Sequence, residues 1–189
     1  MGLTDHSDNP ADLGATSPLV SATVPDWTRE ECGPRDWKPA QQLLRALRLY
    51  ERNLGHSPWA TLRRQQAVLS HRFWSAVTGA DIPIGSHIGG GLLLPHPNGV
   101  VIHPDAVIGP NCLLFQQTTI GTGGTKPGAP TLVGHVDVGA GAKILGGVHI
   151  GEHALIAANA VVLCDVPAGC TAVGAPARVI LPADTKRSR

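Results

Sequence analysis

The chain has 189 residues, enough for one domain of ordinary size with an appended segment. Its 15 Lys and Arg residues nearly balance its 14 Asp and Glu residues, and no basic stripe appears, so nothing indicates a nucleic-acid or anionic-membrane partner. An aromatic content of 4% with 23 glycines fits a thin coil of small and branched residues better than a conventional mixed core.

The segment 1–25 is rich in Asp, Ser, Thr and Pro and contains no long apolar run. We therefore predict a disordered leader over residues 1–25, with neither a signal peptide nor a membrane span, and a cytoplasmic protein. The four cysteines lack the C-x-x-C spacing of a metal site. Cys112 fits the role of a small packing residue.

Residues 26–80 form the next predicted segment, which is short and α-helical. One helix runs from about Pro39 to Asn53, and the other has Ser57 as its N-cap and ends before Gly79. Their apolar residues recur at helical spacing: Leu43, Leu44, Leu47, Tyr50 and Leu54 in the first, and Trp59, Leu62, Leu69, Phe73 and Val77 in the second. These faces need a partner, either the rest of the chain or another subunit.

A six-residue period dominates the sequence from Ile82 to Thr171, which divides into fifteen blocks of six. Eleven of the fifteen third positions are Ile, Leu or Val, and the first positions are mostly apolar, as two inward positions of a short strand require. The period predicts a mostly β fold, a parallel β-helix over residues 81–175, with residues 176–189 as a cap and tail. His96 falls at a third position, where an aliphatic residue is due.

Six segments in this order resemble the serine acetyltransferases, and the match covers almost all of residues 79–180. They are Gly79-Ala80-Asp81-Ile82, Ile88-Gly89-Gly90-Gly91, Pro95-His96 with Gly99, Gln116 before Thr119-Ile120-Gly121, Gly139 to Gly146, and Val173 to Arg178. The resemblance implies a left-handed parallel β-helix of about five coils, in which three blocks of six make one turn. It also implies acetyl-CoA as cosubstrate and a homotrimer, or a dimer of such trimers.

Candidate catalytic residues follow from the same resemblance. His96 would be the base that takes the proton of the acceptor's hydroxyl, a task that suits a histidine near neutral pH. Asp81 matches the carboxylate that orients this histidine. A step of three blocks stacks Thr122, Ala140 and Ala158 in a column of small residues, and the resemblance places acetyl-CoA along it. The predicted cofactor-binding residues are Gly121, Thr122, Gly123, Gly139, Ala140 and Ala158.

Two departures from the family concern the acceptor. Pro95 stands where the family has Asp before the catalytic histidine, and residues 128–130 replace its Arg-His-Pro segment. L-Serine is the default acceptor, another hydroxyl or amine such as a sugar or modified amino acid is the alternative, and His103 and Gln116 are the candidate contacts. The sequence also lacks the C-terminal isoleucine that would indicate a cysteine synthase partner.

A zinc-dependent hydratase on the same fold is a further interpretation. His135 and His153 are three blocks apart and should stack, with His149 on the same coil as His153. No third ligand is evident, so the leading interpretation expects no metal, and a metal assay on chelator-treated protein would separate the two.

Overall fold

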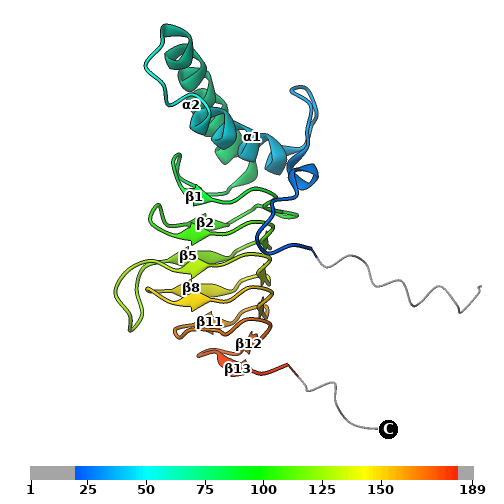
Figure 1. Cartoon of the computed structure of the whole chain (residues 1–189), viewed down its shortest axis with the longest axis vertical. Helices are drawn as coiled ribbons and strands as arrows, with labels where there is room; N and C mark the ends of the chain where they lie inside the picture. The colour runs from blue at the N-terminus through cyan, green and yellow to red at the C-terminus, as the bar shows by residue number, and fades with distance from the viewer. Residues whose placement is uncertain (1–19, 183–189) are drawn as a thin grey trace, which may run out of the picture.

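A computed structural model describes residues 20–182 and shows two helices at one end of a stack of coils (Figure 1). The helical elements are η2 (Trp27–Glu30), α1 (Pro39–Glu51) and α2 (Pro58–Thr78). The strands are β1 (His87–Ile88), β2 (Val101–Ile102), β3 (Val107–Ile108), β4 (Leu113–Leu114), β5 (Thr119–Gly121), β6 (Thr131–Leu132), β7 (Asp137–Val138), β8 (Lys143–Leu145), β9 (His149–Ile150), β10 (Leu155–Ile156), β11 (Val161–Val162), β12 (Thr171–Val173) and β13 (Arg178–Ile180).

The strands form three sheets, which we name A, B and C. Sheet A is β2-β5-β8-β11, sheet B is β1-β3-β6-β9, and sheet C is β4-β7-β10-β12, with β13 added antiparallel to β12. All other strand pairs are parallel and join successive coils, so each strand buries its inward residue against the coils above and below. The predicted parallel β-helix is confirmed, and β13 covers its last coil, while residues 183–189 of the predicted tail lie outside the described residues.

The first coil departs from the six-residue period. Paired residues of regular coils are three blocks apart, as in Val101 and Thr119, but His87 pairs with Val107, two positions further along than the period requires. The inward residues are Leu92 and Leu94 before the corner and Val100 and Ile102 after it, so residues 95–99 include two extra residues. The prediction that His96 occupies an inward position is therefore wrong, because the longer corner leaves it exposed.

A second insertion lies between β5 and β6. Thr119 pairs with Lys143, one full block further along than the period requires, so this coil carries six additional residues. They form a loop over residues 122–130 that folds along the following coils, where Lys126 Nζ lies 2.6 Å from an Asp165 carboxylate oxygen. The backbone N–H of Gly147 also donates to the Lys126 carbonyl (3.2 Å). The loop is thus attached to its own protomer.

Both predicted helices are confirmed, although the first ends at Glu51 rather than Asn53. Ser57 accepts a hydrogen bond from the N–H of Ala60, and Gly79 ends α2 with φ of 67°, a conformation that glycine adopts without strain. The apolar residues of α1 join the core of the first coil, whereas α2 buries only Ala67 and Thr78. No helix within residues 20–182 is long and apolar enough to cross a membrane.

Residues 20–30 run along the corner between sheets B and C as a strap. Buried Asn111 holds it, because its side-chain N–H groups donate to the carbonyls of Ser21 and Val24 (2.7 and 2.8 Å) and its Oδ1 accepts from Asp26 N (2.8 Å). A Cβ on Gly134 would lie 2.0 Å from the Ala22 carbonyl oxygen, so only glycine permits this approach. Residues 20–25, assigned to the leader, are thus packed on the coils, and residues 1–19 lie outside the described residues.

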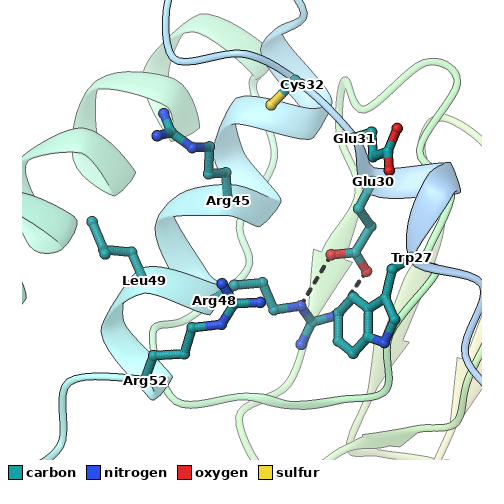
Figure 2. Close-up of a pocket in the computed structure, with 8 residues that line it drawn as sticks. All are labelled: Trp27, Glu30, Glu31, Cys32, Arg45, Arg48, Leu49 and Arg52. Carbon is teal, nitrogen blue, oxygen red and sulfur yellow. Dashed lines mark hydrogen bonds and ion pairs between the residues drawn. The ribbon is translucent and has the colours of Figure 1, made fainter.

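Arg48 joins the strap, α1 and the first coil (Figure 2). Its guanidinium forms two hydrogen bonds with the Glu30 carboxylate (2.9 and 3.1 Å) and donates to the carbonyls of Ile88 and Gly89 (2.6 and 2.7 Å). The Trp27 ring lies over it, with 5.4 Å between the guanidinium carbon and the ring centroid. Burial by itself lowers the pKa of Arg48, but the hydrogen bonds and charge of Glu30 outweigh it and raise that pKa above its ordinary value.

Candidate active site

His96 lies at the corner where the first coil passes from sheet C to sheet A, and it faces an open pocket of about 490 Å³. The start of α1, the end of α2 and the corner itself build this pocket. Its lining residues are Pro39, Ala40, Gln41, Val77, Thr78, Leu94, Pro95, His96, Pro97 and Asn98. The imidazole is therefore accessible to a small molecule, and no charged side chain is among the lining residues.

Asp81 shares this corner. Its N–H donates to the Val100 carbonyl (2.8 Å), and its carbonyl accepts from Ile102 N (2.9 Å). These two bonds place Asp81 beside β2, the strand that follows the His96 corner. The side chain of Asp81 is exposed. Among the described residues, no ion pair or hydrogen bond joins its carboxylate to His96. The fold thus brings the predicted pair to one corner without joining the two side chains.

The two candidate acceptor contacts lie at different places. Gln116 is on the next coil at the His96 corner, and its Oε1 is buried with no hydrogen-bond partner among the described residues. Its neighbour Gln117 donates a side-chain N–H to Asn98 Oδ1 (2.9 Å), which ties the two coils together. His103 lies at the opposite end of β2, where its Nδ1 is 3.9 Å from an Asp105 carboxylate oxygen.

The predicted column of small residues is only partly correct. Ala140 and Ala158 are on adjacent coils at the His96 corner, where the Ala140 carbonyl accepts from the N–H of Asn159 (2.8 Å). Thr122 does not continue this column, because the six-residue insertion places Gly121 opposite Leu145. The predicted set therefore forms two groups: Gly139, Ala140 and Ala158 at the corner between sheets C and A, and Gly121, Thr122 and Gly123 at the corner between sheets A and B.

His135 and His153 stack as predicted, at the corner between sheets B and C. Their Nδ1 atoms are 2.8 Å apart, so one ring donates to the other. Residues 20–182 contain no group of three or more His, Cys, Asp or Glu side chains that could hold a metal ion. Burial lowers the pKa of His135, and the charges of His153 and Arg29 lower it further, against an opposing effect of Asp137.

This histidine pair predicts an acid-sensitive stability. Because the pKa of His135 is lower in the folded chain, the unfolded chain binds more protons, and the stabilisation present above pH 6.5 is lost as the pH falls below it. We expect His135→Asn, which tolerates the positive φ of 46° at this position, to lose less stability between pH 7.5 and pH 5 than the native chain. Urea unfolding at the two pH values measures the difference, and equal losses would contradict the prediction.

The comparisons with known proteins identify the family. No protein-family model matches the chain. Serine acetyltransferase of Synechococcus elongatus is 48% identical over 106 residues, which are 55% of this chain and 43% of that protein. Serine acetyltransferase of Mycobacterium tuberculosis is 39% identical over 129 residues, 67% of this chain and 56% of that protein. The chain belongs to the serine acetyltransferase family. It spans about half the length of these curated relatives.

Solved structures of the serine acetyltransferase family show the same architecture. The soybean enzyme complexed with serine aligns with a TM-score of 0.64 at 37% identity, over 76% of this chain and 58% of that one. A serine acetyltransferase complex with CoA aligns with a TM-score of 0.63 at 32% identity, over 76% and 57% of the two chains. The left-handed parallel β-helix of the family is the fold class that the sequence predicts.

Sequence reasoning missed the walls of the His96 pocket. Gln41 and Thr78 reach it from α1 and α2, and their place depends on how the helices dock on the first coil. No local pattern marks either residue. Asn98, in Pro97-Asn98-Gly99, carried the only usable signal, since these residue types indicate a turn beside the histidine.

Proposed function

We propose that the protein is an acetyl-CoA-dependent O-acetyltransferase, with L-serine as its acceptor. The observation that carries this proposal is the position of His96, which occupies the family's histidine motif and opens into a pocket of small-molecule size. Two kinds of comparison support it: the curated relatives carry the name serine acetyltransferase, and solved relatives are complexed with serine and with CoA.

The chemistry requires one base and no covalent enzyme intermediate. His96 accepts the proton of the acceptor hydroxyl while the hydroxyl oxygen attacks the thioester carbonyl carbon of acetyl-CoA. The tetrahedral intermediate collapses with cleavage of the carbon–sulfur bond, and the CoA thiolate takes the proton from the imidazolium. Asp81, on the same corner, stabilises that imidazolium and orients the ring when the two side chains approach.

A homotrimer would bring the two groups of small residues together at the contact between neighbouring protomers. The two corners flank sheet A, so three copies packed around an axis place the Gly121–Gly123 corner of one protomer beside the Ala140 and Ala158 corner of the next. Coenzyme A would then lie between protomers, where these small residues let it approach the backbone. Gln116, with its unpaired buried amide oxygen, would accept a hydrogen bond from the bound substrates.

A different acceptor is the second candidate, and the lining of the pocket favours it. A zwitterionic amino acid binds best to charged partners, but the pocket beside His96 offers the amides of Gln41 and Asn98 instead. A neutral hydroxyl compound, such as a sugar, would find suitable partners there without the family's Arg-His pair.

An acceptor panel tests the proposed function. We expect release of the CoA thiol from acetyl-CoA to depend on L-serine, in an assay that also includes other amino acids, sugars and amines. Release only with another hydroxyl or amine compound would replace serine with the second candidate. Thiol release with none of the acceptors would contradict the acetyltransferase proposal.

A further inference from the structure

The corner that carries His96 has few backbone hydrogen bonds of its own. Pro95 and Pro97 have no N–H to donate, and within residues 20–182 neither the N–H nor the carbonyl of His96 forms a backbone hydrogen bond. The corner is closed only after the histidine, where Val100 N donates to the Pro97 carbonyl (3.1 Å). The conformation of the segment around His96 therefore depends on the residues that follow it.

Gln117, on the next coil, forms two hydrogen bonds with this corner, both to Asn98. Its backbone N–H donates to the Asn98 carbonyl (2.9 Å), and its side-chain N–H donates to Asn98 Oδ1 (2.9 Å). Asn98 lines the pocket together with His96 and is separated from it only by Pro97, whose ring fixes one of the intervening backbone angles. The direction in which the imidazole leaves the corner therefore depends on Gln117.

The backbone conformation of Gln117 is unusual for a glutamine. Its φ of 60° lies in the left-handed region, and it belongs to a column of four such residues on successive coils at the corner between sheets C and A. The other three are Gly99, Gly141 and Asn159, residue types that adopt this conformation readily. A glutamine at such a φ indicates a role for its side chain.

The neighbouring residues leave room for the two amides. A Cβ on Gly99 would lie 2.5 Å from Gln117 Nε2, and a Cβ on Gly79, the residue that ends α2, would lie 2.7 Å from Asn98 Nδ2. Lys143 on β8 donates from Nζ to the Gln117 carbonyl and so holds Gln117 from the following coil. The amide pair thus connects the second coil, the His96 corner and the end of α2.

We propose that Gln117 is a positioning residue for His96: its hydrogen bonds to Asn98 hold the corner in the conformation that directs the imidazole into the pocket. The proposal rests on the proposed function, in which His96 is the base. Gln117 acts through Asn98, since it is not among the residues that line the pocket. A histidine with several orientations spends only part of its time within reach of the acceptor's proton, which lowers kcat without weakening the binding of acetyl-CoA.

Gln117→Gly tests the proposal without adding backbone strain, because Gly99 and Gly141 occupy the same place on the neighbouring coils. We expect kcat for thiol release with the best acceptor of the panel to fall about 5- to 10-fold, the factor that one lost hydrogen bond gives. The KM for acetyl-CoA should change by less than about 2-fold. The unfolding midpoint should stay within about 2 °C of the native chain, because Gln117 is exposed. A native kcat would overturn the proposal.

A double variant separates the amide pair from other effects of the glycine. Asn98→Ala should also lower kcat, but adding Gln117→Gly to it should lower kcat no further, because the side-chain hydrogen bond is already absent. If Gln117→Gly reduced kcat by the same factor in both backgrounds, the two residues would act independently, contrary to the proposal. Gln65→Ala is the matched control, because it removes an exposed glutamine amide from α2, and it should retain native kcat.

The NMR signal of the His96 ring tests the same inference without catalysis. Its proton–carbon cross-peak, assigned by its loss in His96→Ala, should shift and broaden in Gln117→Gly and in Asn98→Ala. The ring signal of His87, which lies on sheet B, should not change. An unchanged His96 signal would overturn the proposal even if the chain released thiol with none of the acceptors. A shifted signal without thiol release from the native chain would instead contradict the proposed acetyl transfer and leave the role of Gln117 at the corner in place.

Discussion

His96→Ala should lower kcat for acetyl transfer by about 10²- to 10⁴-fold, the usual contribution of a general base. The KM for acetyl-CoA should change little, because the proposed role of His96 is proton transfer to and from the acceptor and not cofactor binding. The change should leave the fold intact, since the side chain is exposed on a corner that already carries two extra residues. Thiol release from acetyl-CoA with the best acceptor of the panel measures the effect.

A matched variant makes this prediction specific. His87→Ala removes an exposed histidine from β1 on sheet B, away from the pocket, and should retain native kcat. Asp81→Asn should reduce kcat less than His96→Ala, because the base stays in place and loses only its orienting charge. Native turnover by His96→Ala, with an unchanged unfolding midpoint, would assign the base to another residue.

The six-residue period predicts the coils well because every short strand buries the same positions. It fails at His96 for a geometric reason. Each short strand buries two residues that are two positions apart. Ile82, Ile88 and Leu94 are the second buried residue of their strands, whereas Val100 is the first buried residue of the next strand. The two inserted residues therefore leave an apolar residue at every sixth position, and the pattern does not show the insertion. The loop insertion is hidden in the same way, since six extra residues equal one full period.

Only those residues of the candidate site that belong to sequence motifs were predictable. His96, Asp81 and Gln116 belong to motifs and are at one corner in the structure, but Thr122 was misplaced by counting three blocks across the insertion. The strap was not predictable, because residues 20–26 bind through their backbone groups to the side chain of Asn111, which lies 85 or more residues further along the chain. Neither the six-residue period nor the composition predicts such long-range contacts.

Arg48→Met should lower the free energy of unfolding by about 3–5 kcal/mol, the cost of removing one partner from a buried ion pair. The variant leaves the Glu30 carboxylate, 7% exposed, without its cation and removes the donors to the carbonyls of Ile88 and Gly89. For a chain of this length the unfolding midpoint should fall by about 6–20 °C. Thermal unfolding followed by circular dichroism measures the change.

Two further variants separate the buried pair from general effects of removing an arginine. Arg45→Met changes an exposed arginine three residues earlier on α1 that makes no ion pair among residues 20–182, and its stability should stay within about 0.5 kcal/mol of the native chain. Glu30→Gln combined with Arg48→Met should recover part of the loss, because no uncompensated charge then remains buried. If Arg45→Met and Arg48→Met were equally stable, the ion pair between Arg48 and Glu30 would contribute nothing measurable to holding the strap and α1 on the first coil.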